Sequence, residues 1–90
     1  WDASANQVVI HTLTENTTFS APSNQADGAF YGLKIVQDAS AAKTVAYNSV
    51  FKFAGATAPT MTATLSATDH YIFRSDGTNM HCVGMAQEVS

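Results

Sequence analysis

Residues 69–86, DHYIFRSDGTNMHCVGMA, decide the fold of this chain. They contain two runs in which apolar and polar residues alternate, and an Asp76-Gly77 pair lies between the runs. Alternation with a period of two is typical of a strand with one buried face, and Asp-Gly between two such runs is a strong hairpin signal. The stretch therefore predicts a hairpin of two strands, 69–75 and 80–86.

The predicted hairpin has a core face and a mixed face. Tyr71 and Phe73 share the core face with Met80 and Cys82, whereas the opposite face carries His70, Ile72, Arg74, His81, Val83 and Met85. A small monomer would leave the aliphatic side chains of the second face in water, and exposed apolar patches of this kind mark interaction surfaces. We therefore expect an oligomer interface formed by His70, Ile72, His81, Val83 and Met85.

The rest of the chain also favours strands, because β-branched and aromatic residues dominate and turn residues recur about every eight to twelve positions. The predicted strands are 7–13, 17–21, 30–37, 43–48 and 51–53, with a weak strand or extended ribbon at 60–65. In the fifth of these, Phe51 and Phe53 are expected to point inward and Lys52 outward. We expect an all-β fold: a small antiparallel β-sandwich of about seven or eight strands, in one domain that spans residues 1–90.

The composition narrows the range of partners. Charged residues make up 12% of the chain, against about 25% in a typical soluble protein. Four Lys and Arg residues cannot form the positive stripe that a phosphate backbone requires. No apolar run approaches the roughly 20 residues of a membrane-spanning helix. The sequence thus predicts neither a nucleic-acid partner nor membrane insertion.

A chain this short needs additional packing to be stable. A domain of this size buries only about two-thirds of the surface that its unfolded chain exposes. The single cysteine, Cys82, cannot form an intrachain disulfide. Self-association is therefore the expected supplement. Because the sequence begins with Trp1 rather than Met, we interpret it as a fragment, expected to be the C-terminal part of a longer protein.

The sequence contains no recognisable catalytic constellation. His81 and Cys82 are neighbours, but adjacent side chains on a strand point to opposite faces, so the imidazole and the thiol cannot meet. Glu15 and Glu88 are isolated from other carboxylates along the chain. The sequence therefore predicts a protein that is not an enzyme, with no catalytic residues and no cofactor.

Two kinds of binding site deserve consideration. His70 and His81 are expected to lie diagonally across the hairpin, and His11 could add a third metal ligand; surface histidines without a metal are the commoner case, and we predict no metal site. Carbohydrate recognition uses aromatic faces with amide and hydroxyl groups. The receptor-binding candidates of this type are Tyr31, Tyr47 and Asn48, although both tyrosines also fit a packing role in their strands.

Most of the chain resembles a module that recurs in virion proteins of tailed bacteriophages. The resemblance is carried by LTENTTF at 13–19, DG at 27–28, LKIVQD at 33–38, TVAYN at 44–48, FKF at 51–53, APTMT at 58–62, DHYIF at 69–73 and SDGTN at 75–79. Such modules are small β-sandwich knobs of tail fibres, tailspikes and related fibre-like appendages.

The resemblance implies a homotrimeric structural or adhesive module of the virion that attaches to the host. Its partners would be further copies of itself and a host-surface glycan or receptor. Two alternatives stay open: a trimerisation or folding cap that binds no ligand, and a carbohydrate-binding accessory domain of a secreted hydrolase.

Overall fold

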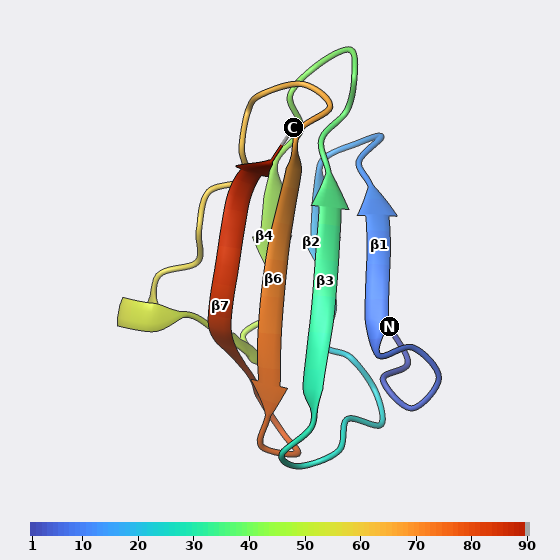
Figure 1. The fold of residues 1–90 in the computed structure, drawn as a ribbon, viewed down its shortest axis with the longest axis vertical. Helices are drawn as coiled ribbons and strands as arrows, with labels where there is room; N and C mark the ends of the chain where they lie inside the picture. The colour runs from blue at the N-terminus through green and yellow to red at the C-terminus, as the bar shows by residue number, and fades with distance from the viewer. Residues whose placement is uncertain (90) are drawn as a thin grey trace.

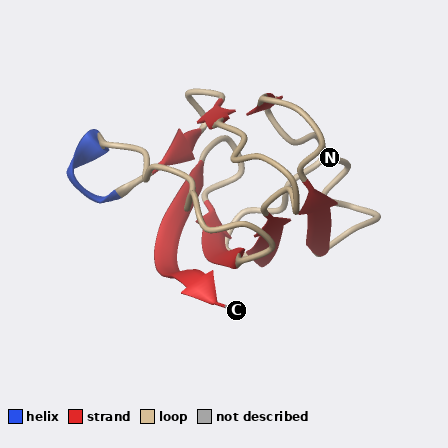
Figure 2. Cartoon of the chain, turned by 90° about the horizontal axis from the view of Figure 1, so that it is seen from above, coloured by secondary structure: helices blue, strands red, loops and turns tan. Residues whose placement is uncertain are grey.

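The computed structural model describes residues 1–89 and consists of seven β-strands in two layers (Figure 1). The strands are β1 (Val8–Thr12), β2 (Thr17–Phe19), β3 (Phe30–Val36), β4 (Val45–Tyr47), β5 (Phe51–Lys52), β6 (Thr68–Ser75) and β7 (Met80–Val89). A short 3-10 turn, η1 (Ala54–Ala56), stands out beside the sheet (Figure 2). The all-β class and the number of strands predicted from the sequence are confirmed.

The larger layer is a five-stranded sheet in the order β1-β3-β6-β7-β5, and the smaller layer contains only β2 and β4. The sheet is mixed and not antiparallel throughout, which corrects the expectation: β3–β6 and β6–β7 are antiparallel, whereas β1–β3, β2–β4 and β5–β7 are parallel. The reason is the path of the chain. It alternates between the layers from β1 to β5, so strands of one layer are joined by crossovers, which parallel pairing requires.

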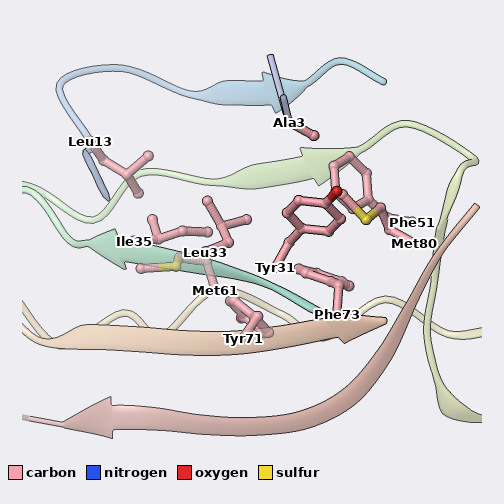
Figure 3. Close-up of a cluster of buried hydrophobic side chains, with 10 residues drawn as sticks. All are labelled: Ala3, Leu13, Tyr31, Leu33, Ile35, Phe51, Met61, Tyr71, Phe73 and Met80. Carbon is pink, nitrogen blue, oxygen red and sulfur yellow. The ribbon is translucent and has the colours of Figure 1, made fainter. Parts of the chain in front are cut away.

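The core lies between the two layers (Figure 3). Alternate residues of β3 and β6 supply much of it, so that Leu33, Ile35, Tyr71 and Phe73 are each at most 2% exposed. The predicted inward direction of Phe51 is confirmed by its exposure of 5%. Aromatic rings dominate one end of this core, where Trp1, Tyr31, Tyr47, Phe51, Phe53, Tyr71 and Phe73 form edge-to-face and stacked pairs.

The segment 60–65, which we call the ribbon, forms no strand: residues 60–63 have no regular secondary structure, and the chain bends at Thr64 and turns at Leu65. Its backbone is held by side chains rather than by another strand: the Gln37 Nε2 donates to the Thr62 carbonyl oxygen at 2.8 Å, and the Thr62 N–H donates to the Asp69 carboxylate at 3.1 Å. Gln37 and Asp69 are both buried, at 1% and 0% exposed. Because a buried backbone group needs a partner, these two side chains replace the strand that would otherwise pair with the ribbon.

Replacing Leu33 with alanine should lower the free energy of unfolding by about 3 kcal/mol, because removing a buried leucine side chain loses apolar contacts and leaves a cavity. Urea denaturation followed by circular dichroism measures the change. The control is Thr18→Ala, an exposed position on β2, for which the change should stay within about 0.5 kcal/mol. Equal effects of the two substitutions would contradict the assigned core.

Candidate functional site

One whole face of the five-stranded sheet is uncovered by any described element. Figure 1 looks onto this face, with β2 and β4 behind the sheet. Its large apolar side chains are between 47% and 64% exposed. We call this surface the open face; its apolar members are Val8, Ile10, Phe30, Ile72 and Val83. The prediction that the hairpin exposes an apolar patch is confirmed, and β1 and β3 extend the patch across the sheet.

The register explains how β1 and β3 join the hairpin. Val8 is paired with Gly32, and Gly32 is paired with Ile72, so the three residues form one row across the sheet. Gly32 has no side chain, which leaves room for Val8 to lean over it. The sequence of β1 contains three consecutive apolar residues, so it does not show which of them are exposed. The position of β1 beside β3 could not be predicted either, because strand order is not encoded in the local sequence.

Met85 is the one predicted interface residue that does not lie on the open face. A register shift separates the pairs Ile72–Gly84 and Phe73–Cys82, so Val83 has no opposite partner. An extra residue of this kind reverses the alternation beyond it. Met85 is therefore paired with Tyr71 on the inner side of the sheet, at its edge, and is 56% exposed there. His70, Ile72 and His81 lie on the open face as predicted.

The open face is basic as well as apolar. Three of the four Lys and Arg residues of the chain, Lys34, Lys52 and Arg74, occupy outward positions of its strands. Of the two carboxylates in these strands, Asp69 is buried on the inner side and Glu88 accepts a hydrogen bond from the Thr64 hydroxyl. The Arg74 guanidinium lies 5.8 Å from the centre of the Phe30 ring, its directly paired neighbour. This cation–π contact holds an apolar ring and a charge side by side.

The hairpin turn supplies an acidic group at one corner of this face. The Asp76 Oδ1 accepts hydrogen bonds from the N–H groups of Thr78 and Asn79 at 2.9 and 2.6 Å, and its Oδ2 lies 3.0 Å from the His81 Nε2. Gly77 has φ of 89°, a conformation that glycine adopts without strain. The predicted Asp-Gly turn is therefore confirmed. The hydrogen bond from Asn79, followed by those from His81 and Thr78, holds the pKa of Asp76 well below its usual range.

The three receptor-binding candidates do not form one exposed surface. Tyr31 is only 5% exposed and its hydroxyl accepts a hydrogen bond from the Ala26 N–H, which is the packing role that its strand position also fits; its contact with a receptor stays a prediction. The Tyr47 ring packs among aromatic side chains, and burial raises the pKa of its hydroxyl, which has no hydrogen-bond partner within residues 1–89. Asn48 is exposed, and its role in receptor binding stays a prediction.

The histidines do not come together as a metal site would require. His81 is paired with Arg74, four residues along β6 from His70, which corresponds to about 13 Å. His11 lies on the other side of the sheet, where its ring meets Phe19 edge to face at 5.4 Å. No group of three metal-ligating side chains occurs within the described part of the chain. The Cys82 thiol is half-buried, and burial raises its pKa.

A hollow with a volume of about 600 Å³ lies on the opposite layer, between β4 and the ribbon. Small and aliphatic residues form most of its walls, and Lys43 is the one charged residue that lines it within residues 1–89. Among the described residues, Tyr47 is the one aromatic residue of its lining, and no carboxylate or side-chain amide lines it beside that ring, as a sugar site would use.

Comparison of this chain with protein families, with curated proteins and with solved structures finds no match. No helix of residues 1–89 has the length and hydropathy needed to cross a membrane.

The hairpin turn should give the protein a pH-dependent stability. The pKa of Asp76 is lowered in the folded chain, so its stabilising effect is complete above the pKa of an unfolded aspartate, about 4, and is lost as the pH falls toward the folded value. Asp76→Asn should therefore lower the melting temperature at pH 7, and the difference from the parent protein should narrow between pH 4 and pH 2. Glu15→Gln, which removes an exposed carboxylate, serves as the control. A difference that widens on acidification would contradict the assigned turn.

Proposed function

We propose that this chain is a structural and adhesive module of a bacteriophage virion appendage, such as a tail fibre, a tailspike or a capsid fibre knob. It works as a homotrimer and presents several copies of a weak host-binding surface at once. The source is suggested by the sequence resemblance. The observation that carries self-association is the open face, a whole apolar side of the larger sheet that no described element covers.

The open face can supply a large part of a contact between subunits. The molecule measures 38 × 29 × 20 Å, and loops extend beyond the strands in the plane of the sheet, so the face is smaller than this outline (Figure 1). Strands about 4.8 Å apart that rise about 3.3 Å per residue give this sheet a face on the order of 500 Å². A standard interface buries about 800 Å² on each partner, so loops at the rim of the face would contribute the rest.

The charges on the open face favour a ring over a two-fold sandwich of identical faces. Two copies packed face to face would bring Lys34, Lys52 and Arg74 of both copies, six cations in all, into one interface. In a cyclic trimer each face instead meets a different surface of the next copy, because such interfaces are heterologous. Asp2, Glu15 and Asp27 are exposed and Asp38 is half-buried; all four lie outside the strands of the face, and their carboxylates could serve as its counterparts.

A trimer would strengthen attachment to a host through multivalent binding. Three weak sites on one rigid body bind far more tightly together than one alone, because the second and third contacts form at a high effective concentration. The low charge of the chain and its small exposed polar side chains suit a surface that meets uncharged glycans. Exposed loops, including Asn48, are the segments that we expect to touch the host.

Sedimentation equilibrium should show a trimer at protein concentrations of about 10 μM. Ile72→Lys should reduce it to monomers, because a charged ammonium would have to be buried in the centre of the interface. Ser40→Lys adds the same charge in an exposed loop and should leave the trimer intact. A monomer at every concentration up to about 1 mM would contradict the proposal.

Binding to an array of bacterial surface polysaccharides tests the adhesive part of the proposal. The trimer should bind at least one class of O-antigen or capsule, and the Ile72→Lys monomer should bind it at least about tenfold more weakly, since avidity is lost. A trimer that binds no glycan and no host cell would instead support the trimerisation cap.

A further inference from the structure

The free edge of β1 is the second uncovered feature of the larger sheet. β1 pairs with β3 on one side, and none of residues 1–89 pairs with its other side (Figure 1). The hydrogen bonds at the two ends of the pairing run from the Gly32 N–H to the Gln7 carbonyl oxygen at 2.9 Å and from the Leu13 N–H to the Val36 carbonyl oxygen at 2.8 Å. Odd-numbered residues of this strand therefore bond to β3.

The even-numbered residues face the other way. In a parallel ladder, the N–H and C=O of one residue point to one side and those of the next residue to the opposite side. Val8, Ile10 and Thr12 consequently direct three donors and three acceptors away from the sheet. Within residues 1–89 none of these groups takes part in a turn, loop or inter-strand hydrogen bond on that side.

This edge lacks the features that usually prevent strand pairing. Proteins protect free edges with charged residues, proline, bulges or very short strands. The sequence of β1 is VVIHT, with no proline, carboxylate, lysine or arginine, and its register with β3 is regular over five residues. The opposite edge is different: β5 has two residues and an exposed lysine, and β7 has two register shifts. Of the two edges of the larger sheet, the β1 edge is therefore the one that can pair with a strand of another molecule.

We propose that β1 pairs antiparallel with β1 of a second copy, about a two-fold axis at Ile10, so that two sheets join into one. Ile10 then lies opposite Ile10 of the other copy, and Val8 lies opposite Thr12 in both directions. These are the residues whose backbone groups point outward, so three donors on each copy give six hydrogen bonds and leave no group of the edge unpaired.

The side chains fit the same register. Val8, Ile10 and Thr12 of both copies form one row of β-branched residues on the open face, and such cross-strand pairs stabilise a sheet. The strand carries no carboxylate, lysine or arginine, so the two-fold axis brings no like charges of that kind together. The contact extends the apolar surface of the open face across both copies, which gives it continuity with the interface proposed above.

This edge contact goes beyond the proposed trimer. It uses backbone N–H and C=O groups that point sideways in the plane of the sheet, whereas the trimer uses side chains that project from the open face. A strand pair of five residues is a small interface, so we expect it to form at high local concentration, as between neighbouring assemblies. Its effect would be to link trimers to one another.

Amide hydrogen exchange measured by NMR tests the pairing on the unmodified chain. The N–H groups of Val8, Ile10 and Thr12 should exchange at least about tenfold more slowly at 1 mM protein than at 20 μM, because only the paired edge protects them. The Ile72→Lys variant separates this contact from the trimer. Sedimentation of that variant should show a monomer–dimer equilibrium, with the same concentration-dependent protection.

Two substitutions at one position identify the hydrogen bonds as the cause. Ile10→Pro removes an N–H that faces outward, and proline is tolerated at such positions of edge strands. Made in the Ile72→Lys background, it should abolish the dimer and the protection of Val8 and Thr12, while slow exchange at Leu33 and Tyr71 reports an intact core. Ile10→Thr keeps the N–H and should retain the dimer.

Three results would overturn the edge contact. One is fast exchange of all three amides at 1 mM. Another is protection that disappears in Ile72→Lys at every concentration, which would mean that the trimer covers the edge. The third is equal loss of dimer in Ile10→Thr and Ile10→Pro, which would assign the effect to the side chain. If the unmodified chain formed no trimer but still formed the β1 edge dimer, the result would contradict the proposed function and leave the edge contact supported.

Discussion

The unequal size of the two layers is the constraint on which the rest of this structure depends. A sheet has two faces, and the larger sheet has five strands, whereas the smaller layer offers two strands of three residues each. The small layer and the ribbon can cover one face and no more. The core therefore forms on that side, and the open face is left with its apolar side chains in water. This is why we propose self-association, since burying such a surface is favourable by about 25 cal/mol for each Å².

Buried polar side chains let the thin layer close over the core. The ribbon at 60–65 pairs with no strand. The side chains of Gln37 and Asp69, which come from the larger sheet and its end, form hydrogen bonds to the carbonyl oxygen and the N–H of Thr62 instead. Gln37 also accepts a hydrogen bond from the Lys43 N–H and donates to the Lys43 carbonyl oxygen, so one amide ties the ribbon to the segment that leads into β4. The hollow between these two segments exists because they are joined at one end and unpaired along their length.

The open face and the β1 edge offer two different kinds of contact. The face presents rings, methyl groups and cations and favours a complementary, acidic and apolar surface. The edge presents backbone donors and acceptors and favours another extended strand. Since the two directions are perpendicular, one assembly can use both. The proposed role in a fibre-like appendage would use both, since a fibre requires close packing within a unit and contacts between units.

The sequence by itself determined the all-β class, the Asp76-Gly77 hairpin and the outward direction of His70 and Ile72, because period-two alternation and turn chemistry are local properties. It did not reveal the parallel pairs, which depend on a chain path that alternates between layers. The inner position of Met85 depends on one unpaired residue in β7, and the burial of Tyr31 depends on what packs above it. Only the tertiary structure decided these features, because strand order, register shifts and burial arise from contacts between residues far apart in the chain.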